Sequence, residues 1–169
     1  MSFSKKYLPE FVYGGIDGSV TTFAVVAGAI GASLSSSIIL ILGFANLFAD
    51  GFSMAISNYL SVKSRQGKTE YCEEKKHPVK TAFATFLAFL FIGFIPLLSF
   101  VLAAFFISLQ TNQFLYSFIL TGFALLLVGA VKGVVVKKHF IKSALETLII
   151  GGVAALLAFG VGYLLRGLA

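Results

Sequence analysis

The sequence has few charged residues and one cysteine, and each scarcity excludes a class of protein. Charged residues make up 12% of the chain and hydrophobic residues 58%, a balance that soluble domains do not have. Cys72 has no second cysteine with which to form an intrachain disulfide. The longest polar stretch, residues 63–78, is too short and too charged to fold by itself. The sequence therefore predicts an integral membrane protein of one domain, residues 1–169, with no soluble domain.

Five apolar runs of about 20 residues or more supply the lengths that a helix needs to cross a bilayer. They predict an all-α polytopic membrane protein with five transmembrane helices. The first run is too long for the apolar region of a cleaved signal peptide and contains Asp17. Pro9 is expected to end any earlier helix, and Pro96 to kink the third span. The spans are predicted at about residues 11–32, 37–62, 79–107, 113–136 and 143–165.

The basic residues are unevenly distributed between the predicted loops. If the N-terminus is cytoplasmic, 12 of the 13 Lys and Arg residues lie in inside segments and only Arg166 lies outside. The two outer loops, near Ser35 and Thr111, carry no charge. This distribution follows the positive-inside rule. It predicts a cytoplasmic N-terminus and accounts for the net charge of +6 without a nucleic-acid partner.

Of the seven acidic residues, Glu10 and Glu146 lie near span ends, three lie in the loop after the second span, and Asp17 and Asp50 fall inside predicted spans. A carboxylate in a membrane is costly, so it usually faces a cavity, a partner or a substrate. Apart from Lys80 at the start of the third span, the first, second, third and fifth spans contain no Lys or Arg to pair with it. A buried carboxylate can instead take up a proton or bind a cation, and a protein that alternates between these states would couple cation movement to protons. Alternatively, Asp17 is the N-cap of a first span that starts at Gly18.

The second span adds a stripe of possible ligands. Asn46, Asp50, Met54 and Asn58 recur every four residues and so share one helical face. Carboxylate and amide oxygens suit hard divalent ions, whereas a thioether sulfur favours softer transition metals. The predicted metal ligands are therefore Asp17, Asp50, Met54 and Asn46, with a preference for Fe²⁺ or Mn²⁺. In the simpler alternative, Met54 packs in the core, and Asn46 and Asn58 form hydrogen bonds between helices.

The segments YGGIDGSVTTFAVVAGAIGASLS and LGFANLFADGFSMAISNYLSVKS, within residues 13–64, resemble the vacuolar iron transporter family. The resemblance implies a homodimer of five-helix subunits in a lipid membrane. It also implies export of Fe²⁺ or Mn²⁺ from the cytosol in exchange for protons, along a path between the subunits. Asp17 and Met54 match family positions that line this path.

The sequence departs from the family pattern in two places. Many relatives have a glutamate where Asn46 stands and a small residue where Asp50 stands. They also insert a long Glu- and Met-rich domain after the second span, where this chain has a short loop with Glu70, Glu73 and Glu74. We therefore expect metal capture and affinity to differ from those of longer relatives.

The residues and the resemblance together predict a dimeric, proton-coupled exporter of Fe²⁺ or Mn²⁺ in the cytoplasmic membrane of a prokaryote. No permanently bound cofactor is expected. The alternatives are a passive divalent-cation channel and a membrane scaffold whose acidic side chains are protonated and dispensable. An enzyme is not expected, because the spans contain no hydrolytic motif or His-rich cluster.

Overall fold

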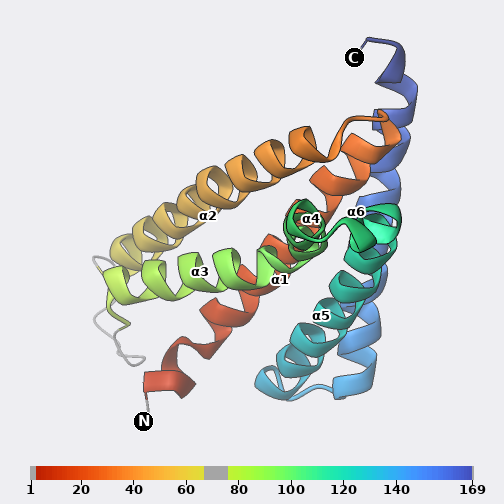
Figure 1. Cartoon of the computed structure of the whole chain (residues 1–169). Helices are drawn as coiled ribbons and strands as arrows, with labels where there is room; N and C mark the ends of the chain where they lie inside the picture. The colour runs from red at the N-terminus through yellow and green to blue at the C-terminus, as the bar shows by residue number, and fades with distance from the viewer. Residues whose placement is uncertain (1–2, 67–75, 169) are drawn as a thin grey trace.

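The computed structural model describes residues 3–66 and 76–168, which form a bundle of helices (Figure 1). Two short 3-10 helices, η1 (Ile107–Asn112) and η2 (Arg166–Leu168), accompany the α-helices. The elements are α1 (Phe3–Gly31), α2 (Ser36–Gln66), α3 (Pro78–Gly93), α4 (Ile95–Phe105), η1 (Ile107–Asn112), α5 (Gln113–Val135), α6 (Phe140–Leu165) and η2 (Arg166–Leu168).

The helix lengths confirm an all-α polytopic membrane protein. Four helical segments are long and apolar enough to span a bilayer, and the bent pair α3–α4 makes five if it counts as one span. Many large apolar side chains on the outer surface are exposed, including Ile41 on α2, Phe91 on α3 and Leu156 on α6. Such a surface is suited to contact with lipid rather than with water.

Helix α1 is the central element of the bundle, packing against α3 and α6 and also touching α2 and α5. Glycines allow two of these close approaches. A Cβ added at Gly18 would lie 2.6 Å from the carbonyl oxygen of Phe89 in α3, and one at Gly28 would lie 3.3 Å from that of Ala158 in α6. The missing side chains thus let neighbouring backbones contact α1 on two sides.

The two proline predictions have different outcomes. The bend of 48° between α3 and α4 confirms the kink at Pro96, which stands at the second position of α4. The prediction for Pro9 is wrong, because α1 begins at Phe3 and continues through this proline. A proline removes one backbone hydrogen bond from a helix. Here the preceding turn is held by Tyr7, which is 5% exposed and accepts a hydrogen bond from the backbone N–H of His77 at 3.2 Å.

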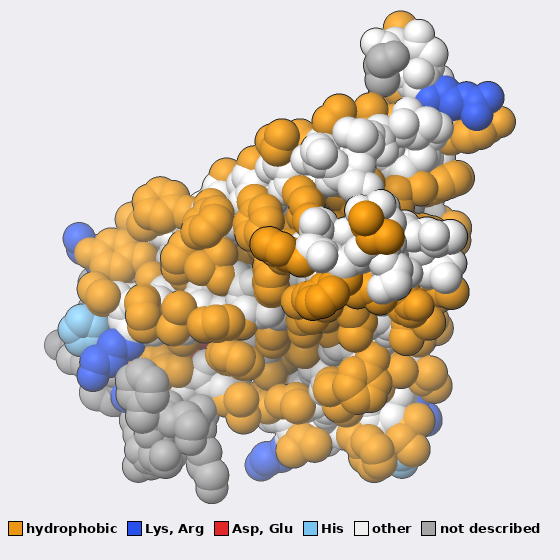
Figure 2. Space-filling view, viewed as in Figure 1, with side chains coloured by type: hydrophobic (Ala, Val, Ile, Leu, Met, Phe, Trp, Pro, Cys, Tyr) orange, Lys and Arg blue, Asp and Glu red, His pale blue; other side chains and the backbone are white. Residues whose placement is uncertain are grey.

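Basic side chains gather at one end of the bundle. In Figure 2 they appear at the left and lower edges, near the N-terminus, the start of α3 and the turn between α5 and α6, and again at the opposite end beside the C-terminus. The last of these is Arg166, whose guanidinium lies 4.3 Å from the centre of the Tyr163 ring. At the basic end, Lys132 of α5 pairs with Glu146 of α6 at 3.4 Å. The cytoplasmic placement of this end remains a prediction.

Candidate functional site

Asp17 of α1 and Asp50 of α2 lie close enough for their carboxyl groups to interact electrostatically. Chain geometry explains this proximity. Asp17 stands 14 residues before the end of α1 at Gly31, and Asp50 stands 14 residues after the start of α2 at Ser36. With a rise of about 1.5 Å per residue, both lie about 21 Å from the turn that joins the helices. Both side chains are partly exposed.

The turn between α1 and α2 is fixed by its own hydrogen bonds. Ser33 adopts the left-handed conformation with φ of 61°. The backbone N–H of Leu34 donates to the carbonyl of Ala29 at 2.9 Å, in the pattern of a Schellman cap. The turn therefore sets the relative height of the two carboxylates.

Asn46 joins α2 to α1 one helical turn beyond the carboxylates. Its Nδ2 donates to the hydroxyl oxygens of Thr21 at 3.5 Å and Thr22 at 3.3 Å. The Thr21 hydroxyl in turn donates to the backbone carbonyl of Asp17 at 2.8 Å. The interhelical hydrogen bond expected for Asn46 is thus confirmed, and its role as a metal ligand stays a prediction.

The remaining two residues of the α2 stripe face different surroundings. Met54 is half-buried and packs against an apolar cluster that includes Leu47 and Phe89. Asn58 donates from Nδ2 to the Thr85 hydroxyl of α3 at 2.7 Å, as its simpler interpretation predicts. Steps of four residues drift by about 40° each around a helix, so the stripe turns from α1 at Asn46 toward α3 at Asn58. Met54 and Asp50 lie between these ends.

Within the described residues of a single chain, few side chains that could bind a metal lie close together. Among residues 3–66 and 76–168, no group of three or more His, Cys, Asp or Glu side chains could hold a metal ion. The loop residues Cys72, Glu70, Glu73 and Glu74 lie outside this part of the chain. Asp17 and Asp50, with Met54 one turn along α2, therefore stay predicted ligands, with no third carboxylate, imidazole or thiol grouped with them in the described part of the chain.

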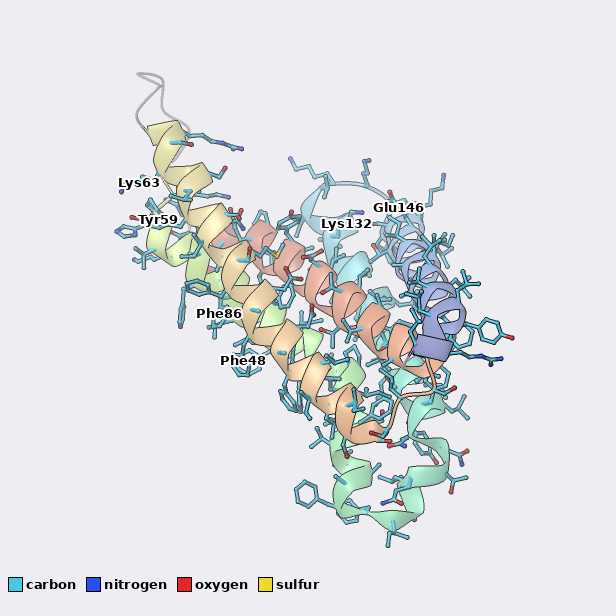
Figure 3. The ribbon with its side chains drawn as sticks, turned by 90° about the horizontal axis from the view of Figure 1, so that it is seen from above. Phe48, Tyr59, Lys63, Phe86, Lys132 and Glu146 are labelled. Atoms are coloured by element: carbon cyan, nitrogen blue, oxygen red, sulfur yellow. The ribbon has the colours of Figure 1, made fainter. Side chains whose placement is uncertain are left out.

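Two hollows of the described structure are lined by residues other than Asp17 and Asp50. A groove of about 590 Å³ between α1 and α3 is lined by apolar side chains such as Phe11 and Phe83, with Lys80 beside them. An open hollow of about 570 Å³ has α1 as its floor, between α2 and α6. Figure 3 shows this arrangement from above, with α1 running between these two helices. The α1 helix is thus accessible from one face of the bundle.

Beside the ligand stripe, α2 presents small exposed side chains. Ala45, Ala49, Ser53 and Ser57 recur every four residues and are all exposed. Figure 3 shows Phe48 on the edge of α2 turned away from α1, near Phe86 of α3. Exposed small residues adjacent to the ligand stripe allow another helix to come close to it.

Sequence reasoning gave no role to an ion pair at the basic end. Lys76 Nζ lies 2.6 Å from Glu10 Oε1, and the Glu10 side chain is only 13% exposed. The two residues are 66 positions apart, so no local pattern indicates their contact.

Comparisons with known proteins found a family model and relatives similar to most of this chain. A family model described as VIT family matches residues 8–76 and 65–163. A vacuolar iron transporter of Toxoplasma gondii is 29% identical over 96% of this chain and 76% of its own length. Vacuolar iron transporter 1 of Arabidopsis thaliana is 26% identical over 89% of this chain and 82% of its own length. Vacuolar iron transporter homolog 4 of the same plant is 32% identical over 92% of this chain and 82% of its own length.

Alignment lengths separate these relatives into two kinds. The alignment with the Toxoplasma protein spans 228 positions, more than the 169 residues of this chain, so that relative contains inserted residues. The alignment with homolog 4 spans only 166 positions. The two ranges matched by the family model meet in the loop between α2 and α3.

Proposed function

The chain belongs to the VIT family, and from this premise we propose that it exports Fe²⁺ or Mn²⁺ from the cytosol in exchange for protons. The similar proteins named above are iron transporters, so the chain is a membrane transport protein rather than an enzyme. The observation that carries the finer proposal is the juxtaposition of Asp17 and Asp50, partly exposed on adjacent helices. Within the described residues, neither carboxylate has a Lys or Arg partner.

Two adjacent carboxylates suit the exchange of a divalent ion for protons. Like charges close together repel one another, and a bound cation or bound protons relieve the repulsion. One divalent ion neutralises the pair, and so do two protons. Alternation between these states would move one metal ion against two protons with no change of charge at the pair.

The neighbouring ligands support selection of a transition metal. Met54 places a thioether one helical turn from Asp50, and Asn46 places an amide one turn away in the other direction. Sulfur ligands are not preferred by Mg²⁺ or Ca²⁺. A mixed oxygen and sulfur set favours Fe²⁺ or Mn²⁺ over these hard ions.

A homodimer completes the partial ligand set in this proposal. A second copy related by a two-fold axis along the α2 face would double each ligand, giving four carboxylates and two thioethers. The exposed small side chains Ala45, Ala49, Ser53 and Ser57 support this contact. The path then runs between subunits, and no further cofactor takes part. A cytoplasmic basic end and residence in a prokaryotic cytoplasmic membrane complete the proposal.

The test is transport in liposomes that contain the purified protein, an internal metal-sensing dye and an internal pH dye. Mn²⁺ or Fe²⁺ added outside should enter while protons leave. Asp17→Asn and Asp50→Asn should each lower the initial rate at least about tenfold, because each removes a charged ligand, and the loss of about 1.4 kcal/mol of cation binding already corresponds to a factor of ten. Glu146→Gln is the matched control, since it removes an exposed carboxylate on α6.

Each alternative function has its own outcome in this assay. Metal entry without opposing proton flow identifies a channel. No entry of any divalent ion supports the scaffold. Transport at the parent rate by both aspartate variants would remove the carboxylates from the mechanism.

A further inference from the structure

Tyr13 of α1 carries a large aromatic side chain that the fold does not bury. Tyr13 is 60% exposed, although the same part of α1 packs closely on α3. That packing uses Gly14 and Gly18, which approach the backbone of α3. These glycines lie about 100° and 140° around the helix from Tyr13. The Tyr13 side chain therefore stands on a face of α1 that α3 leaves open.

This open face also carries Asp17. Tyr13, Asp17 and Thr21 follow one another in steps of four residues, so they share one side of the helix. Asp17 and Thr21 are partly exposed, and Ala24 continues the same face into the hollow between α2 and α6. In Figure 3, α1 is seen running between these two helices. One accessible face thus leads from the hollow, past Asp17, to Tyr13.

Tyr13 lies on the basic-end side of Asp17. It is one helical turn, or about 6 Å, nearer the start of α1. Side chains on a helix lean toward its N-terminus. The Asp17 carboxyl group is thereby directed over the turn that carries Tyr13, and the Tyr13 ring extends further toward the basic end. A cation that moves along this face from the basic end to Asp17 must pass the ring.

We propose that Tyr13 is a specificity-determining residue whose ring narrows the approach from the basic end to Asp17 and Asp50. The inference rests on the proposed function and deepens it. A passage too narrow for a fully hydrated ion selects ions by how readily they release water. Mg²⁺ loses its water reluctantly, so the ring hinders Mg²⁺ more than Mn²⁺. In the proposed dimer, the second copy of Tyr13 narrows the same passage from the other side.

This role differs from the one proposed for Met54. A thioether ligand acts on the bound ion and therefore changes the equilibrium affinity. The Tyr13 ring acts on passage and therefore changes the rate of entry. It also differs from the role of an aromatic anchor at the membrane surface, which is common for exposed tyrosines in membrane proteins. An anchor does not distinguish one divalent ion from another.

The experiment compares initial rates of Mg²⁺ and Mn²⁺ uptake into liposomes that contain a dye for each ion. Tyr13→Ala should raise the ratio of the Mg²⁺ rate to the Mn²⁺ rate about fivefold, which corresponds to about 1 kcal/mol in the difference between the two activation free energies. Tyr13→Phe keeps the ring and should keep the parent ratio, and Tyr13→Leu should lie between. Competition of Mg²⁺ with Mn²⁺ for binding at equilibrium, measured from free Mn²⁺ by electron paramagnetic resonance, should be the same in Tyr13→Ala and the parent.

Phe11→Ala is the matched control. Phe11 is another exposed aromatic residue of α1, but it lines the groove between α1 and α3. It lies about 200° around the helix from Tyr13, so its loss should leave the ratio unchanged.

Several results would overturn the proposal. An unchanged ratio in Tyr13→Ala, including an equal slowing of both ions, would leave Tyr13 a structural or anchoring residue. A raised ratio in Tyr13→Phe would assign the effect to the hydroxyl, and an equal rise in Phe11→Ala would assign it to general loosening of α1. Altered competition at equilibrium would make Tyr13 part of the binding site rather than of the passage. Failure of the parent protein to transport any divalent ion would instead refute the proposed function.

Discussion

Replacement of Gly18 by alanine tests whether the close approach of α1 and α3 supports the metal site. The added Cβ would lie 2.6 Å from the Phe89 carbonyl oxygen and 2.9 Å from the Phe89 Cα. Both are backbone atoms, so no side-chain rotation relieves the contact and α3 must move away. Overpacking of this kind costs about 1–3 kcal/mol. The higher helix propensity of alanine offsets part of this cost, because it stabilises a helix by about 1 kcal/mol relative to glycine.

The matched control is Gly152→Ala on α6, where an added Cβ meets no atom within 4 Å. It gains the same helix propensity without the clash, so the difference between the two variants isolates the overpacking cost. The assay is thermal unfolding of the purified protein in detergent. At about 2–4 °C for each kcal/mol, Gly18→Ala should melt about 2–12 °C below Gly152→Ala.

Gly18→Ala should also lower Mn²⁺ uptake, because Gly18 adjoins Asp17 and movement of α3 disturbs the contacts around that carboxylate. A melting temperature equal to or above that of Gly152→Ala would refute the packing argument. Unchanged uptake would show that the site tolerates displacement of α3.

Two further predictions concern the ligand set and the dimer. Met54→Leu should keep the melting temperature within a few degrees, because leucine packs against the same apolar cluster. In the uptake assay, Mg²⁺ should compete better with Mn²⁺ in this variant than in the parent protein. Unchanged competition would exclude the thioether as a ligand. Ser53→Cys, in a chain that also carries Cys72→Ser, should form a disulfide-linked dimer in mild oxidant, whereas the exposed control Phe83→Cys on α3 should not. Equal cross-linking at both positions would contradict a dimer through α2.

The sequence alone predicted an all-α membrane protein and the kink at Pro96. Both predictions depend on local features, namely the length of the apolar runs and the missing backbone N–H of the proline. The proximity of Asp17 and Asp50 was also foreseeable. A short polar turn forces the two helices to be antiparallel neighbours, and the equal spacing from that turn brings the carboxylates to one height.

Other features depend on contacts that local patterns do not encode. The Lys76–Glu10 pair joins residues 66 positions apart and depends on how α3 packs on α1. The continuation of α1 through Pro9 depends on the burial of Tyr7, which holds the first turn in place. Similarly, Asn58 looked like part of one stripe with Asp50, yet the drift of the helix directs it to Thr85.

The capped turn at Ser33 is a common reference point for α1 and α2. The number of residues between this turn and each carboxylate sets the height of Asp17 and of Asp50 in the bundle. One residue inserted into α2 ahead of Asp50 would rotate that carboxylate by about 100° and shift it by about 1.5 Å, and an equal insertion in α1 beyond Asp17 would not undo the rotation. We therefore expect functional relatives to have no insertions or deletions between the positions of Asp17 and Asp50. The loop between α2 and α3 lies outside this segment, so its length can change without moving either carboxylate. A polypeptide of this design can gain or lose a whole domain at that loop without disturbing the alignment of its two carboxylates.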